Sequence, residues 1–338
     1  MAETPPEDRL DALDAWLAAA LGGRPFRREP ASADASFRRY FRVFAGDATW
    51  IAMDAPPPAE DCRPFVRIAG LMRAAGLNAP EVHAADLDRG FLLLTDLGRQ
   101  TFLQAIEAGH PDPSALFSGA RDALVRWQLA SREGELPPYD EALLRREIDL
   151  FPDWYLARHA SAPLAGSEGD AVRAVFDRVL AANLAQARVF VHRDFMPRNL
   201  MVSQPAPGVL DFQDAVHGPV SYDIACLYRD AFLSWPEDVV LDGTIRYWER
   251  ARDAGLPVPA DFGDFWRDVE WMGLQRHLKV LGIFARLRYR DGKPAYLEDA
   301  PRFLGYVRAT AERYRELAPL ARLVDRLEGR EAKAGYTF

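Results

Sequence analysis

Residues 188–212, RVFVHRDFMPRNLMVSQPAPGVLDF, constrain the fold of this chain more than any other segment. Three short apolar runs, VFV, LMV and GVL, alternate there with polar loops, which is the pattern of brief buried strands. Long stretches on either side carry the three- and four-residue spacing of helices instead. An aspartate beside a buried strand is costly unless it binds a cation or accepts hydrogen bonds. We therefore expect the residues that carry the chemistry to lie in this segment, which interrupts a helical region.

The polar residues of this segment have a defined spacing. His192, Arg193 and Asp194 are followed by Asn199, five residues after the aspartate, and Asp211 comes twelve residues after Asn199. The H-R-D-x-x-x-x-N pattern is typical of kinase-like phosphotransferases. In those enzymes a carboxylate meets the acceptor hydroxyl, while an amide oxygen and a second carboxylate reach the Mg²⁺ on the nucleotide phosphates. The competing interpretation is that Asp194 and Asp211 only cap turns.

Two neighbouring residues are expected to support this loop. His192 is expected to hold the loop backbone by hydrogen bonds, since that is the usual role of a buried histidine. Asp223, in GPVSYDIA, opens a predicted helix. It can complement the positive end of the helix dipole or fasten the catalytic loop from below, and the two roles are compatible.

The N-terminal part of the chain is predicted to be rich in strands. After an amphipathic helix within residues 1–23, the pattern over 26–54 indicates three strands, and that over 81–98 indicates two more. Residues 64–75, between these two groups, have helical spacing.

From residue 101 onward helices are expected, beginning with the capping-box pair Thr101 and Gln104. Ser234 and Glu237 form a second start signal. The expected helices cover 114–131, 140–159, 168–186, 221–233, 236–254, 262–288 and 301–328. The fold class is therefore α+β and bilobal, with a small β-rich lobe (1–95), a hinge (96–98) and a larger, mainly helical lobe (99–338) that share one cleft.

Composition excludes several classes of protein. Of 338 residues, 49% are hydrophobic and 27% are charged, as in an ordinary folded protein. The net charge of −8 argues against general nucleic-acid binding, which needs an excess of Lys and Arg. Cys62 and Cys226 cannot form a disulfide framework, and we expect buried free thiols. There is no apolar run of about 18 residues and no secretory signal, so we expect a cytoplasmic protein without a membrane segment.

Taken together, the motifs resemble the aminoglycoside phosphotransferase and choline kinase family, which has a protein-kinase-like fold. HRDFMPRN, LDFQDA and GPVSYDIA are similar to that family's catalytic loop, metal-binding strand and following helix. DASFRRYFRV, MDAP, LLLTDLG and LQRHLKVLGIFARLRYRDGK are further similar to its bacterial N-acetylmuramate/N-acetylglucosamine kinases. The resemblance covers nearly the whole chain. It implies a cytoplasmic, ATP- and Mg²⁺-dependent sugar kinase of peptidoglycan recycling that phosphorylates the anomeric hydroxyl.

The resemblance also implies roles for single residues. Asp194 would be the base that meets the sugar hydroxyl, and Asn199 and Asp211 would hold magnesium. Nucleotide contacts are expected from the loop residues Asp34, Ala35, Ser36 and Phe37 over the phosphates, from the hinge residues Asp96, Leu97 and Gly98 at the adenine, and from Arg42.

One position departs from the family. Met53 and Asp54 stand where related kinases place a phosphate-binding lysine on the third strand. Arg42 or Arg39, on the preceding strand, is expected to supply the missing positive charge. Arg193 stands where glycine is common in the aminoglycoside branch, and its contact with a phosphate or with its neighbours is left open.

The acceptor is expected to lie against helices of the larger lobe. An aromatic surface beside a carboxylate suits a pyranose ring, and a cationic pair suits an acidic sugar such as N-acetylmuramate. Ordinary helix packing and a solvated basic stripe are the alternatives. The candidate residues are Glu147, Trp154 and Tyr155 within 140–159, Arg276 and Lys279 within 262–288, and Arg198 and Gln213 beside the motifs.

Two other functions are compatible with these motifs. One is phosphorylation of an aminoglycoside, choline or another alcohol, and the other is a nucleotide-binding pseudokinase. The implied partners are a small-molecule amino sugar and ATP, with no nucleic acid, membrane or obligate protein partner.

Overall fold

The computed structural model describes residues 6–33, 37–110 and 112–330. The chain divides into two compact units, one from Met1–Trp127 with Pro197–Asp214 and one from Gln128–Met196 with Ala215–Phe338. Asp34, Ala35 and Ser36, which are predicted to lie over the phosphates, fall outside the described residues. The lobe boundaries at 95–98 stay a prediction.

The first unit is built on an antiparallel sheet of five strands in the order β1-β2-β3-β5-β4. The strands predicted over 26–54 and 81–98 are thus confirmed. The strands are β1 (Arg27–Ala33), β2 (Arg39–Ala45), β3 (Ala48–Asp54), β4 (Val82–Asp86) and β5 (Phe91–Thr95), and the helix before them is α1 (Pro6–Ala20).

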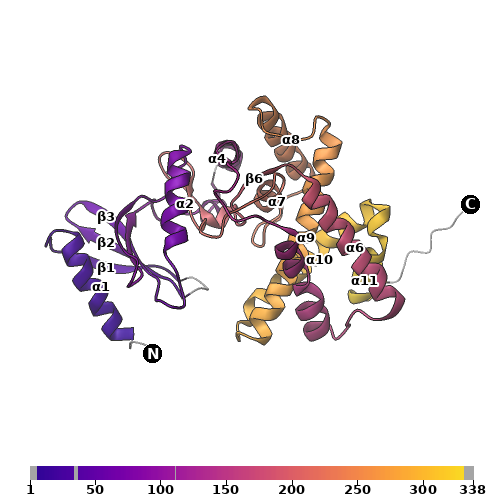
Figure 1. Cartoon of the computed structure of the whole chain (residues 1–338), viewed down its shortest axis with the longest axis horizontal. Helices are drawn as coiled ribbons and strands as arrows, with labels where there is room; N and C mark the ends of the chain where they lie inside the picture. The colour runs from indigo at the N-terminus through magenta and orange to yellow at the C-terminus, as the bar shows by residue number, and fades with distance from the viewer. Residues whose placement is uncertain (1–5, 34–36, 111, 331–338) are drawn as a thin grey trace, which may run out of the picture. The chain divides into compact units, whose positions relative to one another are not determined.

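Alternation along the strands gives this sheet two different faces. Phe41 and Ala52 are paired across β2 and β3 and form one core with Leu13 of α1. Figure 1 shows α1 beside β1, β2 and β3. Arg42 and Met53, each one residue further along its strand, therefore lie on the opposite face of the sheet from α1.

The remaining elements of the first unit follow their local signals. α2 starts with Pro64 in its first turn, and Gly76, just beyond its end, has φ +77. The predicted capping box of α3 is confirmed, since both hydrogen bonds between Thr101 and Gln104 are present. These elements are α2 (Arg63–Ala74), α3 (Phe102–Glu107), the 3-10 helix η2 (Pro197–Asn199), β7 (Leu200–Met201) and β8 (Gly208–Val209), while α4 (Pro113–Leu129) crosses from the first unit into the second.

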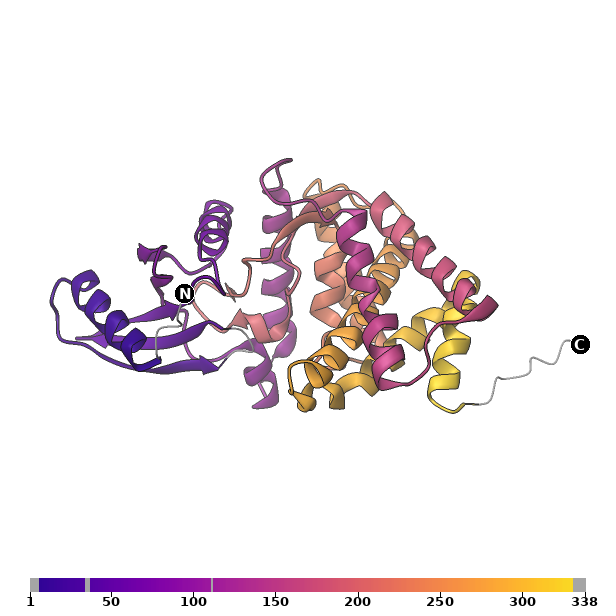
Figure 2. The ribbon, with the colours of Figure 1, turned by 60° about the horizontal axis from the view of Figure 1, so that its bottom comes forward.

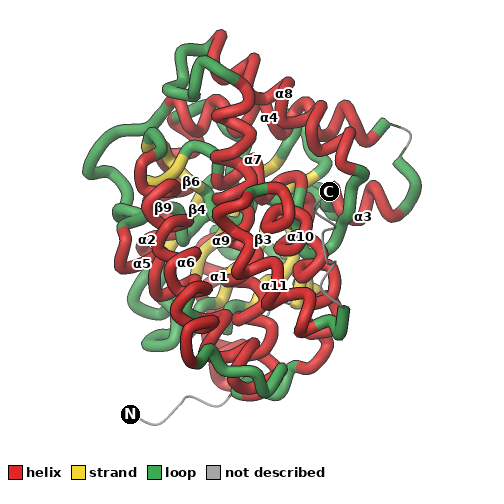
Figure 3. The backbone as a smooth tube through the Cα atoms, turned by 90° about the vertical axis from the view of Figure 1, so that its right-hand side faces the viewer, coloured by secondary structure: helices red, strands yellow, loops and turns green. Residues whose placement is uncertain are grey.

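The second unit is mainly helical and surrounds one long helix, α9. α9 packs against α5, α6, α7 and α10. Figure 3 labels α9 together with these helices, and Figure 2 shows the ribbon from another side in the colours of Figure 1. β6 (Arg188–Val191) and β9 (Val216–Pro219) form an antiparallel pair. The helices are α5 (Glu141–Ile148), the π-helix η1 (Phe151–His159), α6 (Gly166–Ala185), α7 (Tyr222–Tyr228), α8 (Glu237–Asp253), α9 (Phe262–Tyr289), α10 (Ala300–Arg313) and α11 (Ala318–Leu327), with 3-10 turns η3 (Pro294–Asp299) and η4 (Arg315–Leu317). The predicted α+β class is confirmed.

Two expected helices are interrupted. The helix expected over 140–159 ends at Ile148 and is followed by η1, because Pro152 has no N–H to donate to the carbonyl of Ile148. The helix expected over 301–328 is divided into α10 and α11 by η4, and Pro319 stands in the first turn of α11.

The helix expected over 236–254 is present, but Ser234 does not cap it. α8 begins after Pro236, with no side-chain cap. The hydroxyl of Ser234 instead lies 3.0 Å from the hydroxyl of Tyr306, on α10. Ser234 therefore bonds to a residue that is distant in the sequence and not to the first turn of α8.

Cys62 and Cys226 are buried free thiols, as predicted. Within the described parts of the chain, no helix has the length and apolar character needed to cross a membrane.

We expect Gly282→Ala to destabilise the second unit. A Cβ on Gly282 of α9 would lie 2.3 Å from the carbonyl carbon of Leu150 and 2.4 Å from its oxygen, so backbone would have to move. Such overpacking costs about 1–3 kcal/mol. The measurement is the urea dependence of far-UV circular dichroism.

Gly305→Ala is the matched control, since a Cβ on Gly305 of α10 would meet nothing within 4 Å. It should stabilise the protein by about 0.5–1 kcal/mol. Equal effects of the two substitutions would contradict the close packing of α9 on Leu150.

Candidate active site

The loop after β6 is held by the buried carboxylate of Asp223. Asp223 lies in the first turn of α7 and is 0% exposed. Its Oδ2 accepts the backbone N–H of His192 at 2.7 Å, and its Oδ1 accepts that of Arg193 at 3.0 Å. The ring Nδ1 of His192 accepts the N–H of Asp194 at 3.3 Å. α7 therefore fixes the backbone that carries Asp194.

Asp194 presents its carboxylate next to a buried cation. Its side chain is 43% exposed, whereas that of Arg276, on α9, is only 4% exposed. Arg276 Nη2 lies 3.9 Å from Asp194 Oδ1, and Nη1 makes no hydrogen bond within the part of the chain that the structure describes. An accessible carboxylate with a cation behind it can orient a hydroxyl and take its proton.

A buried carboxylate cluster, formed by Glu147, Arg193, Lys279 and Tyr139, lies beside the catalytic loop. Glu147, on α5, is 5% exposed. Its Oε1 accepts from Arg193 Nη2 and, at 3.0 Å, from Lys279 Nζ. Its Oε2 accepts from the hydroxyl of Tyr139. The structure thus brings two predicted substrate residues, Glu147 and Lys279, together with Arg193.

The surroundings of Glu147 and Asp223 affect the pKa values of these two carboxyl groups differently. Burial raises the pKa of Glu147, but Lys279 and Arg193 outweigh it and bring that pKa to about 2. Burial raises the pKa of Asp223 to about 7, against the two backbone N–H groups that favour its charged form. Glu147 is therefore a fixed negative charge at every pH near neutrality.

In the first unit, Asn199 and Asp211 lie side by side. Asn199 Nδ2 is 3.3 Å from Asp211 Oδ2, and Gln213 Nε2 donates to Asp211 Oδ1 at 2.8 Å. The N–H of Leu210 donates to the carbonyl of Asn199 at 2.9 Å. Asp211 has φ +60, a left-handed conformation. A tight turn after β8, not a straight strand end, presents this carboxylate.

This pair fits a hard divalent cation. Carboxylate and amide oxygens are the protein ligands that Mg²⁺ takes, and Mg²⁺ keeps several waters or phosphate oxygens besides. The described residues contain no group of three His, Cys, Asp or Glu side chains that would form an all-protein metal cage. A cation held by Asn199, Asp211 and a bound nucleotide suits the donors that are present.

Arg42 clamps the segment 96–98. Its Nε donates to Asp96 Oδ2 at 2.7 Å, and its Nη2 donates to the carbonyl of Gly98 at 2.6 Å. Arg42 is 7% exposed. Its side chain thus has two partners in the predicted hinge.

Arg39 also has a counterion. Its Nε donates to Asp54 Oδ2 at 2.9 Å, while Arg9 of α1 donates to Asp54 Oδ1 at 2.8 Å. A third arginine–carboxylate pair was not predicted from the sequence. In it, Arg38 Nε donates at 2.9 Å to Glu60, which precedes α2 in the chain. Phe37, beside it, is 71% exposed.

The aromatic residues predicted for the acceptor lie on the π-helix. Tyr155 is 5% exposed and stacks on Phe151 with ring centroids 5.5 Å apart, which is core packing. Trp154 is half-buried. Because the helical phase changes at Phe151, the predicted common face with Glu147 is not an α-helical face. Arg198 lies in η2 of the first unit and is half-buried.

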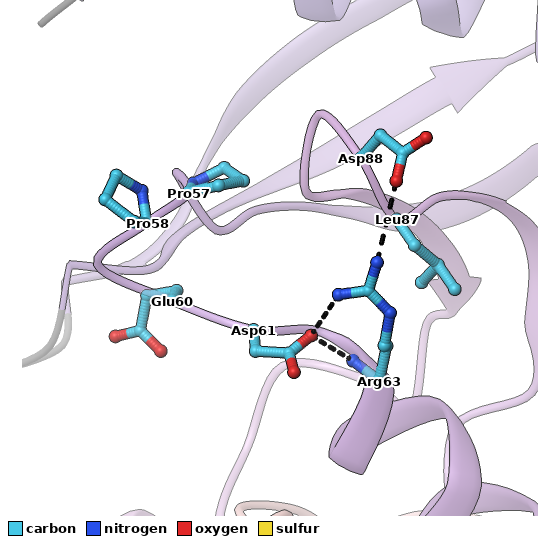
Figure 4. A pocket seen from close by; sticks show the side chains of 7 residues that line it. All are labelled: Pro57, Pro58, Glu60, Asp61, Arg63, Leu87 and Asp88. Carbon is cyan, nitrogen blue, oxygen red and sulfur yellow. Dashed lines mark hydrogen bonds and ion pairs between the residues drawn. The ribbon is translucent and has the colours of Figure 1, made fainter. Parts of the chain in front are cut away.

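Figure 4 shows a surface depression of about 330 Å³ in the first unit. Arg63 bridges Asp61 and Asp88 across it. None of the predicted site residues lines it. The lining residues are Pro57, Pro58, Glu60, Asp61, Arg63, Leu87 and Asp88.

Tyr139 and Tyr222 were missed by the sequence reasoning. Their rings are 5.5 Å apart, and Lys279 Nζ lies 3.4 Å from the hydroxyl of Tyr222. Tyr222 immediately precedes Asp223 in the motif, but nothing in the spacing of Tyr139 signals its contact with Glu147.

We expect the stabilising effect of Glu147 to depend on pH. Its pKa in the folded state, about 2, is below the ordinary 4.5, so its contribution is complete above pH 4.5 and is lost as the pH falls toward 2. Glu147→Gln should therefore lower the melting temperature clearly at pH 7 and progressively less between pH 5 and pH 3. A difference that is constant across this range would contradict the ion pairs of Glu147.

The sequence is similar to those of characterised bacterial kinases. The N-acetylmuramate/N-acetylglucosamine kinase of Pseudomonas aeruginosa is 56% identical over 335 residues, covering 96% of this chain and 98% of the relative. The kinase of the same name from Neisseria meningitidis is 49% identical over 330 residues, with the same coverage of 96% and 98%.

Solved structures of low sequence identity share the fold. Aminoglycoside 2′-phosphotransferase-IIIa in complex with GDP has a TM-score of 0.63 at 15% identity, covering 88% of this chain and 97% of that one. Choline kinase from Streptococcus pneumoniae has a TM-score of 0.60 at 13% identity, covering 89% and 99%. The predicted protein-kinase-like fold is confirmed.

The model of the phosphotransferase enzyme family matches residues 27–262 of this chain. The predicted resemblance is thereby confirmed, and membership of a family of kinases supports the use of a nucleotide and a small-molecule acceptor. With its relatives at 56% and 49% identity, the chain belongs to the phosphotransferase enzyme family, among the N-acetylmuramate/N-acetylglucosamine kinases.

Proposed function

We propose that this chain transfers the γ-phosphoryl group of ATP to the anomeric hydroxyl of N-acetylmuramate or N-acetylglucosamine, in the cytoplasm, as a step of peptidoglycan recycling. The observation that carries the proposal is Asp194, an accessible carboxylate on a loop fixed by Asp223 and backed by Arg276. The names of the relatives supply the sugar.

Phosphoryl transfer requires little from the protein beyond positioning of the reactants and stabilisation of the developing charge. The anomeric oxygen forms a bond to the γ-phosphorus, the bond from that phosphorus to the β–γ bridging oxygen breaks, and ADP leaves. Asp194 orients the hydroxyl and accepts its proton, which then passes to solvent. Arg276 stays protonated and limits the cost of negative charge at this point.

Asn199 and Asp211 would hold Mg²⁺. When bound, the ion neutralises charge on the nucleotide phosphates. Gln213, which donates to Asp211 at 2.8 Å, keeps that carboxylate in place.

The nucleotide is expected to bind to the first unit. Backbone groups of Asp34, Ala35, Ser36 and Phe37 meet the phosphates, and those of Asp96, Leu97 and Gly98 meet the adenine. Arg42 serves this site by fixing residues 96–98.

The acceptor is expected to meet Arg276 at its reacting end. Trp154, half-buried on the π-helix, and Arg198, half-buried in η2, stay candidates for sugar contacts. Tyr155 is a weaker one, because it is already packed on Phe151.

Asp194→Asn should strongly reduce turnover. Loss of the proton acceptor should lower kcat by about 10²–10⁴-fold, while the KM for ATP changes little. The measurement is ADP release with N-acetylmuramate and N-acetylglucosamine, together with loss of the reducing end of the sugar, since an anomeric phosphate prevents ring opening.

Asp242→Asn, at an exposed ion pair on α8, is the control and should leave kcat unchanged. A wild-type protein that turns over an aminoglycoside or choline but neither amino sugar would contradict the proposed acceptor. A wild-type protein with no turnover at all would favour a pseudokinase.

Arg276→Gln should lower kcat/KM for both amino sugars by a similar factor, about 10–100-fold. The reason is that Arg276 Nη2 lies 3.9 Å from Asp194 Oδ1, at the end of the sugar that both acceptors share. A loss confined to N-acetylmuramate would instead place its lactyl carboxylate at Arg276.

A further inference from the structure

Arg193, the residue before Asp194, has an unusual backbone conformation. Its φ is +78, and among the described residues other than glycine only Ser161 and Asp211 also have positive φ. Glycine adopts this region freely, whereas a residue with a Cβ loses about 1–2 kcal/mol there. The surroundings of Arg193 therefore have to hold it in place.

Carboxylates anchor Arg193 both at its backbone and at its side chain. The backbone N–H donates to Asp223 Oδ1 at 3.0 Å. The guanidinium donates to Glu147 Oε1 and lies 5.8 Å from the centroid of the Tyr139 ring. The second anchor belongs to α5, far from α7 in sequence, so the loop is held from two helices.

The acceptor capacity of Glu147 is already used. A carboxylate offers about four lone-pair positions. Glu147 Oε1 accepts from Arg193 and Lys279, and Oε2 accepts from Tyr139 and, at 3.5 Å, from Gln275. Little capacity is left for a sugar hydroxyl, although the sequence predicted Glu147 as a substrate residue.

The charges make Glu147 the key member of the buried carboxylate cluster. Arg193 and Lys279 are two cations whose side chains are 19% and 12% exposed, and both bind the same oxygen of Glu147. Removing one partner of a buried ion pair leaves an uncompensated charge, which is strongly unfavourable. Without Glu147 the two cations repel each other, and Arg193 has to leave its position.

We infer that Glu147 is a positioning residue for catalysis, acting on Asp194 through the side chain of Arg193. The left-handed backbone of Arg193 determines how the side chain of Asp194 is oriented. Glu147 holds that backbone in place by binding the guanidinium of Arg193. The inference rests on the proposed role of Asp194 as the base. A displacement of about 1 Å at a catalytic group costs on the order of 10²-fold in rate.

The test is a double-mutant cycle with Glu147→Gln and Arg193→Gly, measured in the full-length protein with the amino sugars and ATP. Glu147→Gln should lower kcat by about 10–100-fold, with the KM for both substrates within about threefold of the wild type. Arg193→Gly relieves the backbone but loses the anchor, and should lower kcat as well. The double variant should have a kcat no lower than that of Arg193→Gly, because Glu147 then has no guanidinium through which to act on the loop.

Glu270→Gln is the matched control. Glu270 is also buried, at 2% exposure; it binds Arg313 and the hydroxyl of Tyr314 and lies 3.9 Å from Arg229 at the end of α7, and none of these residues is in the catalytic loop. It removes a buried charge outside the catalytic loop and should leave kcat within about twofold of the wild type. An equal loss of kcat in both variants would mean that Glu147 acts only through general stability.

If Glu147→Gln does not fold, Glu147→Gln with Lys279→Met replaces it. This pair of changes removes one negative and one positive charge, so the cluster keeps its net charge while Arg193 loses its anchor. The same loss of kcat is expected from it.

Two further kinetic results would overturn the inference. One is that Glu147→Gln lowers kcat in the Arg193→Gly background by about the same factor as in the wild type. The other is that Glu147→Gln raises the KM for the acceptor and leaves kcat unchanged, which would make Glu147 a sugar-binding residue. Amide hydrogen exchange over residues 192–196 separates this inference from the proposed function. Faster exchange in Glu147→Gln than in Glu270→Gln supports positioning even if no amino sugar is turned over, and equal exchange contradicts it.

Discussion

The hydrogen bonds from the backbone of His192 and Arg193 to the buried carboxylate of Asp223 are the contacts on which the catalytic loop depends. They occur at 2.7 and 3.0 Å and join the start of α7 to the end of β6. A carboxylate is an acceptor on both oxygens, so one side chain can fix two successive peptide groups. The cost is the burial of an acid, which raises the pKa of Asp223 to about 7. A neutral amide could not accept both bonds with the same geometry.

Of the three residues other than glycine that have positive φ in the described part of the chain, two lie in the motif of the proposed active site. Arg193 and Asp211 both have positive φ, and each stands at or beside a residue of the motif. Strained conformations persist only where the surroundings over-determine them. At Arg193 those surroundings are two carboxylates, and at Asp211 they are the amides of Asn199 and Gln213. In both places side-chain hydrogen bonds hold a backbone that glycine would accept more easily.

In the first unit, arginines pair with carboxylates close to the position where related kinases have a lysine. Arg39 and Arg9 share Asp54 on the α1 side of the sheet, and Arg42 holds Asp96. Asp54, which stands next to Met53 where a lysine would be expected, therefore belongs to the packing of α1. The resemblance to related kinases implied that a cation was missing, but the sequence could not show which arginines already had partners.

Local features of the sequence were predictable because they depend on neighbours along the chain. Periodicity predicts the five strands of the first unit, and short-range hydrogen bonding predicts the capping box at Thr101. The spacing of Asp194, Asn199 and Asp211 is read directly from the sequence. The interruption at Pro152 follows from the same local rules, although the periodicity alone suggested a continuous helix.

The contacts of Glu147 were decided by tertiary structure. As a sequence, Glu147, Lys279 and Arg193 are three charged residues on separate segments, and a sugar site was a reasonable interpretation. Folding buries them together, and a buried charge must find a partner of opposite sign or leave the core. The sequence alone thus determined the family and most of the elements, and it supplied the residues that we propose to react. Only the tertiary structure decided which charges pair with each other, because burial and counterions arise from residues that are distant in the chain.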